Sequence, residues 1–130
     1  MTAFVDTNVL VRHLTGGPPE QAARATHLLS RAGQLLLPDL VLAEVVYVLE
    51  SVYRVPRPRV AELARAIVAF GAIEVVDEPA LLRALEVYEL HRLDFADAYL
   101  VAEAEISGVH AVASFDKEIE RVPTVRRVEP

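Results

Sequence analysis

The sequence predicts an α/β domain in which a parallel sheet packs against helices. Short β-like apolar runs alternate along the chain with longer segments of helical periodicity, an order typical of parallel α/β folds. Hydrophobic residues make up 53% of the 130 residues, which is enough for a substantial core. We see no repeat, low-complexity segment or long linker, so we expect residues 1–130 to form a single domain.

The first part of the chain is expected to hold two strands separated by two helices. Ala3–Val5 is a first strand, and Asn8–Leu14 is a short helix broken by a Gly-Gly-Pro-Pro sequence. A second helix runs from about Glu20 to Ala32 before a glycine, and Leu35–Leu37 is a second strand. The apolar face of this second helix carries Ala22, Ala25, Leu28, Leu29 and Ala32.

Two further helices precede a third strand. Leu40–Tyr53 is apolar nearly all round, which predicts a helix buried on more than one side, and Pro56 follows it. Arg59–Phe70 is amphipathic and ends before a glycine, and Ile73–Val76 is the third strand. The apolar face of the amphipathic helix carries Val60, Leu63, Ala64 and Ile67.

The last part of the chain continues the alternation. Helices are expected at Pro79–Arg92 and Phe95–Ser107, strands at His110–Ala113 and Val125–Val128, and a helical turn at Lys117–Arg121. The side chains of the first of these helices that are expected to face the core are Leu81, Leu82, Leu85 and Tyr88. The second shows helical spacing, at i, i+4, i+7 and i+11, in Phe95, Tyr99, Ala102 and Ile106.

Several kinds of site are excluded by the residues present. The chain has no cysteine, and therefore no disulfide, thiolate metal site or cysteine nucleophile. Its four histidines show no ligand spacing, and no nucleophile elbow or phosphate-binding loop occurs. The N-terminus does not resemble a signal peptide, and the longest apolar run, Leu35–Leu49, is interrupted by Pro38, Asp39 and Glu44. We therefore expect a soluble, cytoplasmic protein without membrane contact.

Four acidic residues stand in or beside apolar segments, where an isolated carboxylate is costly. Asp6 follows the first expected strand and Asp116 the fourth, and open parallel sheets bind ligands at the C-terminal ends of their strands. Glu44 and Asp97 lie in the N-terminal parts of two expected helices. If strands one and four are neighbours, these carboxylates converge.

Each acid also has an ordinary structural interpretation. Asp6, with Asn8 beside it, fits a cap of the first helix, and Asp116 fits a turn or a second cap. Asp94 and Asp97 have the spacing of a capping box. Glu44 is the hardest to explain as a solvated side chain, because its neighbours on the helix are apolar.

Converging carboxylates would repel one another, and a divalent cation with oxygen ligands, Mg²⁺ or Mn²⁺, would resolve this repulsion. Such an ion activates water and stabilises charge at a phosphate, which predicts hydrolysis of phosphodiesters. Ser114 is a candidate supporting group or an ordinary strand-end hydroxyl, and Arg12, Arg92 and Lys117 are candidate phosphate contacts or solvated cations.

The net charge of −6 argues only weakly against a nucleic-acid substrate. Without the four candidate acids, 13 basic and 15 acidic residues leave −2, and bound cations would offset more. The mean hydropathy of +0.30 is high for so small a chain. It fits a buried interface, such as a homodimer or a bound partner, and equally a core-rich domain with alanine-rich helices.

The chain resembles the PIN-domain ribonucleases, and among them the VapC-type toxins of toxin–antitoxin pairs. The resemblance extends over essentially the whole sequence. Each motif is short, and their order and spacing make the likeness specific. The segments that carry it are Phe4–Leu10 (FVDTNVL), Leu42–Val46 (LAEVV), Asp94–Leu100 (DFADAYL) and Ser114–Lys117 (SFDK).

This resemblance implies a three-layer α/β/α fold with a five-stranded parallel sheet in the order 3-2-1-4-5. It also implies an endoribonuclease that depends on Mg²⁺ or Mn²⁺, is usually a homodimer, and is blocked by a cognate antitoxin. Carried over to this sequence, the metal ligands and catalytic acids are Asp6, Glu44, Asp97 and Asp116. Asn8 and Ser114 match supporting polar positions, and Asp94 is an auxiliary acid.

One departure and two rival functions accompany this prediction. Several relatives have Ser or Thr before the helix that carries the glutamate, whereas this chain has Pro38-Asp39, with Asp39 as a substitute cap or an added negative charge. A PIN-fold housekeeping nuclease, or a non-catalytic scaffold that binds RNA or protein, would share the same fold. A phospho-receiver-like module with Asp77 as acceptor leaves Glu44 without a role.

Overall fold

The computed structural model describes residues 1–31 and 33–130, and these divide into two compact units, Met1–Val76 and Asp77–Pro130. Ala32, expected on the apolar face of the second helix, lies outside the described residues. Each unit combines strands with helices, as the α/β prediction requires. The single domain expected for residues 1–130 stays a prediction.

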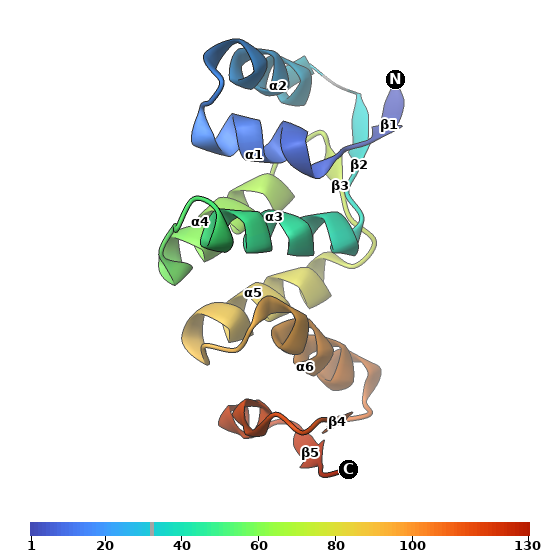
Figure 1. The fold of residues 1–130 in the computed structure, drawn as a ribbon. Helices are drawn as coiled ribbons and strands as arrows, with labels where there is room; N and C mark the ends of the chain where they lie inside the picture. Colours follow the sequence, from blue (N-terminus) through green and yellow to red (C-terminus); the bar gives the residue numbers. More distant parts are fainter. Residues whose placement is uncertain (32) are drawn as a thin grey trace. The chain divides into compact units, whose positions relative to one another are not determined.

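The first unit is built on a three-stranded parallel sheet. Strand β2 is central and pairs with β1 through Ala3 and Leu35, and with β3 through Leu35 and Ile73. Figure 1 shows α1 between α2 and α3, with α4 packed on α3 and the strands beside these helices. In chain order the elements are β1 (Thr2–Phe4), α1 (Thr7–Thr15), α2 (Pro19–Arg31), β2 (Gln34–Leu36), α3 (Asp39–Ser51), α4 (Arg57–Val68) and β3 (Ile73–Glu74).

The ends of α1 and α3 follow from their sequences. Asp6 caps the start of α1, and Gly16 ends it in the left-handed conformation at φ 76°, which glycine adopts without strain. Helix α3 begins after Pro38, whose fixed φ suits a helix start. Asp39 is the first residue of α3, so the interpretation of Asp39 as the N-cap is wrong.

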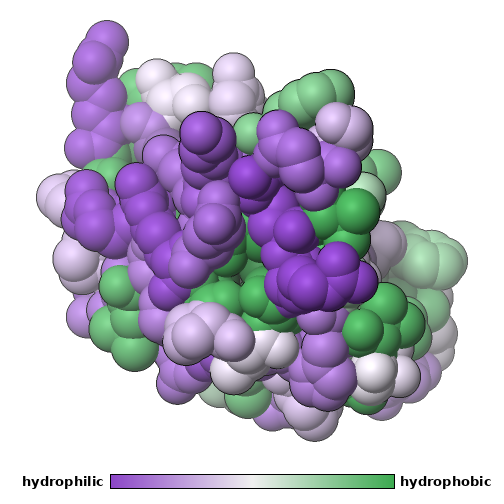
Figure 2. Space-filling model, turned by 90° about the horizontal axis from the view of Figure 1, so that it is seen from below, coloured by the Kyte–Doolittle hydropathy of each residue, from purple (hydrophilic) through white to green (hydrophobic). Residues whose placement is uncertain are grey.

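The second unit contains a helix pair and a two-stranded parallel sheet. Helices α5 (Glu78–Leu90) and α6 (Phe95–Ser107) pack against each other, and β4 (Ala111–Ala113) follows α6. The 3₁₀ helix η1 (Lys117–Arg121) leads to β5 (Arg126–Val128), which pairs with β4 through Val112 and Arg127. Hydrophilic side chains cover most of the face of this unit in Figure 2, with smaller apolar areas between them.

The buried residues largely follow the predicted faces. Every expected strand and helix is present, and Phe95–Ser107 has the predicted bounds. Leu82 is 37% exposed, so its inward assignment is wrong, and Ile106, the last residue of the spaced series on the helix Phe95–Ser107, is 50% exposed. Leu40 and Tyr47 leave an exposed apolar side on α3. Fully buried large side chains include Leu10, Leu29, Leu35, Leu42, Leu49, Ile67, Leu81, Leu85, Tyr88 and Ile119.

The strand orders agree with part of the predicted sheet. The three strands of the first unit have the order 3-2-1 and the two strands of the second unit the order 4-5. The full order 3-2-1-4-5 also requires β1 to pair with β4, and that pairing stays a prediction. No helix within the described residues has the length and apolar character needed to cross a bilayer.

Candidate metal and nucleic-acid site

Asp6 stands between β1 and α1, two residues beyond the end of the strand. It is the N-cap of α1, and its Oδ1 accepts a hydrogen bond from the Thr7 backbone N–H at 2.8 Å. The capping interpretation is therefore confirmed. Capping occupies one oxygen of an exposed carboxylate, and a carboxylate has further acceptor positions, so capping and ligand binding are compatible.

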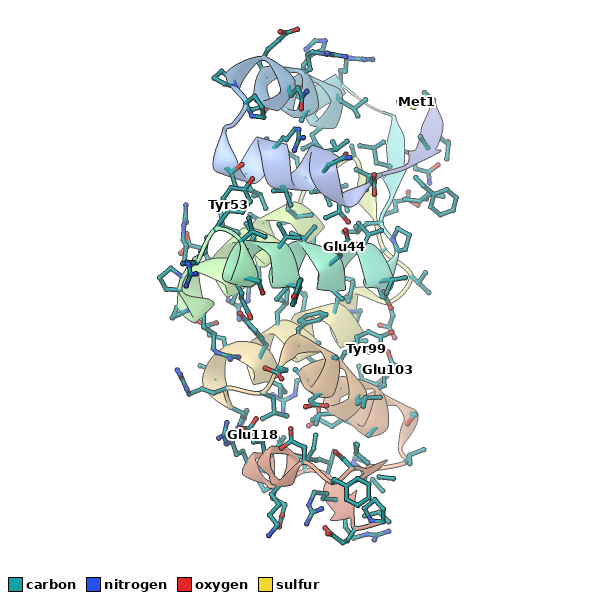
Figure 3. All side chains as sticks on the ribbon, in the orientation of Figure 1. Met1, Glu44, Tyr53, Tyr99, Glu103 and Glu118 are labelled. Atoms are coloured by element: carbon teal, nitrogen blue, oxygen red, sulfur yellow. The ribbon has the colours of Figure 1, made fainter. Side chains whose placement is uncertain are left out.

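Glu44 comes from α3 and lines the same pocket as Asp6. The pocket has a volume of about 250 Å³ and also contains Asn8. Figure 3 shows Glu44 on the side of α3 that faces α1. The position explains why a glutamate interrupts an apolar helix: its carboxylate is exposed to a pocket that already holds a second acid.

Thr7 is a residue of this pocket that the sequence analysis did not single out. Its side chain is only 6% exposed, and its Oγ1 has no hydrogen-bond partner among the described residues. A buried hydroxyl without a partner is costly and points to a missing polar ligand. The sequence signal was its place between Asp6 and Asn8 at the first turn of α1.

Asp97 and Asp116 form a second acidic pair, within the second unit. Asp97 lies in the first turn of α6, and Asp116 is three residues beyond β4. Burial raises the pKa of Asp97, and the charge and carboxyl hydrogen bond of Asp116 raise it further. Asp94 and Glu118 add smaller electrostatic contributions in the same direction. This pair therefore concentrates negative charge in a half-buried position.

The turn that carries Asp116 is held by hydrogen bonds. Ser114 Oγ accepts from the Asp116 backbone N–H, and Asp116 Oδ1 accepts from the Glu118 backbone N–H, both at 2.9 Å. Asp116 is thus the cap of η1 that one interpretation predicted. Arg127, which the sequence analysis did not mention, reaches from β5 and donates to Ser114 O at 2.9 Å.

The other singled-out residues have more ordinary surroundings. Asp94 is at the N-cap position of α6 without a capping side-chain hydrogen bond, so the capping-box interpretation of this pair is wrong. Asp77 caps α5 by accepting from the Ala80 N–H at 3.1 Å. His13 Nδ1 bonds the Thr26 hydroxyl at 2.8 Å, and burial lowers the pKa of His13. Lys117 is exposed in η1.

The predicted acids are thus brought together as two pairs, Asp6 with Glu44 and Asp97 with Asp116. Across the described part of the chain, no cluster of three or more acidic or histidine side chains has a metal-binding arrangement. Convergence of all four acids stays a prediction. Each pair offers carboxylate oxygens, and the unpartnered Thr7 hydroxyl lies beside one of them, so the donor set fits a hard divalent cation.

Comparison with known proteins agrees with these motifs. The model of the PIN domain family matches residues 3–125, and the chain belongs to this family. The predicted resemblance is therefore confirmed. A VapC ribonuclease from Aquifex aeolicus (strain VF5) is 27% identical over 122 residues, which cover 92% of this chain and 90% of that protein.

Two solved structures are also similar to this chain. One is the toxin VapC20 of Mycobacterium tuberculosis, described as cleaving the sarcin–ricin loop. Its TM-score is 0.45 and its identity 22%, covering 91% of this chain and 92% of that one. The other is VapBC2 from Rickettsia felis, bound to a DNA fragment from its promoter. Its TM-score is 0.39 and its identity 16%, covering 98% of both chains.

Proposed function

We propose that this chain is an endoribonuclease that depends on Mg²⁺ or Mn²⁺ and acts as the toxin of a toxin–antitoxin pair. The observation that carries the proposal is the presence of two acidic pairs, each containing one acid just beyond a parallel strand, in a member of the PIN family. Similarity to a VapC ribonuclease over most of both chains supports RNA as the substrate.

The proposal requires the two acidic pairs to meet, and the strands offer a way to join them. The Val5 N–H donates to Leu36 O, toward β2, and the Ser114 N–H donates to Val128 O, toward β5. Because N–H groups alternate in direction along a strand, the residues between point theirs to the other edge of β1, away from β2, and of β4, away from β5. Parallel pairing of those edges would give the order 3-2-1-4-5 in a three-layer α/β/α fold. The family match over residues 3–125 spans both units and supports this arrangement.

Joined in this way, Asp6, Glu44, Asp97 and Asp116 would hold the cation. A bound Mg²⁺ or Mn²⁺ would supply positive charge at the scissile phosphate and lower the pKa of a water. The protein's own contribution is position. The Ser114 hydroxyl and the Glu118 N–H fix the Asp116 turn, while the start of α1 fixes Asp6. Asn8 adds an amide to the pocket, and Asp94 adds negative charge near Asp97.

Two protein partners belong to the proposal: a second copy of this chain and a cognate antitoxin. Leu40 and Tyr47 are 80% and 66% exposed and lie seven residues apart on α3, so they share one side of the helix. Together with the mean hydropathy of +0.30, this apolar side supports a homodimer. Tyr47→Asp should convert the dimer to a monomer in analytical ultracentrifugation. An unchanged mass, or a monomeric wild type, would contradict the homodimer.

The direct test is RNA cleavage by the purified chain with Mg²⁺ or Mn²⁺. The wild type should cleave and Asp6→Asn should not, whereas Glu20→Gln, an exposed acid on α2, should match the wild type. Full cleavage by Asp6→Asn would contradict the assignment. Growth arrest on expression, relieved by the product of a neighbouring gene, would distinguish a toxin from a housekeeping nuclease. A wild type that binds RNA without cleaving it would indicate a scaffold.

A further inference from the structure

The pocket that contains Asp6 and Glu44 continues to residues that cannot help to hold a cation. Arg12, in the last turn of α1, and Tyr53, just beyond α3, line its far end. Figure 3 labels Glu44 in the middle part of α3 and Tyr53 beyond the end of the helix. At a rise of about 1.5 Å per residue, Arg12 is roughly 9 Å along the helix from Asp6. The pocket therefore has an acidic end and a separate end of different chemistry.

An apolar and aromatic surface forms the far end. Val48 and Val52 line the pocket there, and Tyr53, a residue that is 44% exposed, adds a phenol ring. Carboxylate ligands of a cation do not require such a surface. A nucleobase does, because unpaired bases of single-stranded RNA are bound by stacking on aromatic side chains and by apolar contact.

Arg12 supplies a positive charge at the same end. Its Nε donates to Gln21 Oε1 from α2, which holds the guanidinium in place. The terminal amino groups of a guanidinium held through Nε form a fork suited to a phosphate. The far end of the pocket thus combines the Arg12 guanidinium, the Tyr53 ring and valine side chains, all within the first compact unit.

We propose that this end of the pocket is a subsite for one nucleotide of single-stranded RNA next to the scissile phosphate. The base lies on Tyr53 and the valines, and the adjoining phosphate binds Arg12. The whole pocket, with its acidic end included, has a volume of about 250 Å³, which is below the roughly 300–1,000 Å³ typical of small-molecule pockets, so its far end has room for no more than one nucleotide. This inference rests on the proposed function. It identifies Tyr53 as the residue that favours single-stranded RNA, whose bases are free to stack, over paired RNA.

The test measures binding of a labelled short uridine oligoribonucleotide to the full chain by fluorescence anisotropy, with EDTA present to prevent cleavage. Tyr53→Leu keeps an apolar side chain but removes the ring, and should raise Kd about tenfold, within the range for loss of one base–aromatic stack. Tyr53→Phe should keep Kd close to that of the wild type. Circular dichroism confirms that both variants fold.

An abasic oligonucleotide of the same length separates stacking from backbone contact. The wild type and Tyr53→Leu should bind the abasic strand equally, because there is no base to stack. Arg12→Gln should weaken binding of both strands and reduce the salt dependence of Kd, which is the signature of a phosphate contact. Arg24→Gln, which removes an exposed arginine from α2, is the matched control and should change neither.

Equal affinity of Tyr53→Leu and the wild type for the intact strand would overturn the subsite. The subsite would also be overturned if Tyr53→Leu lost as much affinity for the abasic strand as for the intact one. Absence of binding by the wild type would also overturn it. The cleavage assay is independent of these results. Tyr53-dependent binding without cation-dependent cleavage contradicts only the proposed ribonuclease activity. Cleavage with binding that does not depend on Tyr53 contradicts only the subsite.

Discussion

The carboxyl groups of Asp97 and Asp116 interact directly, although one lies on α6 and the other follows β4. Burial and this neighbour both raise the pKa of Asp97, so the charged form of Asp97 is disfavoured in the protein without a metal. A divalent cation bound by this pair would reverse that preference. The pair is therefore the part of the proposed site whose electrostatics are most readily measured.

Asp97→Asn should abolish RNA cleavage without destabilising the metal-free protein. The substitution removes a carboxylate that is repelled by Asp116, so the free energy of unfolding should stay within about 0.5 kcal/mol of the wild type or rise. Mn²⁺ should raise the melting temperature of the wild type and have little effect on the variant, because ligands that bind only the folded state stabilise it. Cleavage assays and thermal unfolding with and without Mn²⁺ provide the measurements.

Glu103→Gln is the matched control for that experiment, since Glu103, labelled in Figure 3, lies on the same helix and is not among the groups that act on Asp97. It should retain both cleavage and stabilisation by Mn²⁺. Equal stabilisation of wild type and Asp97→Asn by Mn²⁺ would remove Asp97 from the ligand set. A large loss of stability in Asp97→Asn would show that its carboxylate has a structural role.

The elements and the acids were predictable because their signals are local. Glycine and proline mark the ends of helices, and a carboxylate within an apolar run, such as Glu44, stands out without any structure. Leu82 was misplaced because helical periodicity gives the direction of a face but not its width, and Leu82, beside the fully buried Leu81, is 37% exposed.

Tyr53 and Arg127 were missed for a different reason. Their importance comes from partners distant in the sequence: Tyr53 shares a pocket with α1, and Arg127 bonds Ser114 across two strands. An arginine on a strand or a tyrosine after a helix is common, and nothing nearby in the sequence distinguishes these. Tertiary proximity alone gives them a role.

Arg127 should be needed to position Asp116. Its side chain, 10% exposed, donates to Ser114 O at 2.9 Å and to Glu120 at 3.0 Å, and also pairs with Glu129. Loss of an outer hydrogen bond to a metal-ligating segment typically weakens metal affinity or activity about 10- to 100-fold. Arg127→Gln should lower cleavage and Mn²⁺ affinity within that range, as measured by kinetics and isothermal titration calorimetry.

Arg126→Gln offers a close comparison, because Arg126 is the exposed neighbour on β5. It should keep the activity and Mn²⁺ affinity of the wild type. If Arg127→Gln lost stability but bound Mn²⁺ as tightly as the wild type, Arg127 would be a structural residue without influence on the site.

The ion pair between Arg83 and Glu105 should make stability depend on pH. Arg83 on α5 donates two hydrogen bonds to Glu105 on α6, at 2.7 and 2.9 Å, and the Thr124 hydroxyl adds another. The hydrogen bond from Arg83 is the main reason that the pKa of Glu105 is lowered from 4.5; Thr124 and the charge of His110 act in the same direction, whereas burial opposes it. A lowered pKa stabilises the folded state above the unfolded pKa, and this contribution disappears as pH falls through the folded value.

Glu105→Gln should therefore cost about 1–3 kcal/mol of unfolding free energy near neutral pH. The cost should shrink when the pH falls below the ordinary glutamate pKa. Urea unfolding of the variant and the wild type, at neutral pH and at that acidic pH, measures the cost. Glu86→Gln removes the other, half-exposed acid that Arg83 contacts, and should cost less than about 1 kcal/mol. A pH-independent cost for Glu105→Gln would show that packing, rather than charge, explains its effect.

Hydrogen exchange should reveal whether β1 and β4 pair. Because Val5 and Ser114 direct their N–H groups to β2 and β5, the N–H groups of Phe4, Ala111 and Ala113 point to the opposite strand edges. In the five-stranded order these amides form ladder hydrogen bonds at the centre of the sheet, so they should exchange as slowly as the amides of β2. Buried central strands open only near global unfolding, whereas exposed edges open at far lower free energies.

The amide of Leu36 on β2 provides the slow reference, and that of Val76, a residue that is 92% exposed, provides the fast one. Slow exchange at both Phe4 and Ala113 requires that each of the two strand edges is paired. Phe4→Pro removes the backbone N–H of residue 4. Loss of protection at Ala113 in this variant would identify β1 as the strand that pairs with β4. Fast exchange at both edges would mean that the two units do not share one sheet. The carboxylates of Asp6 and Asp116 would then lack the common strand edge on which the proposed four-acid site depends.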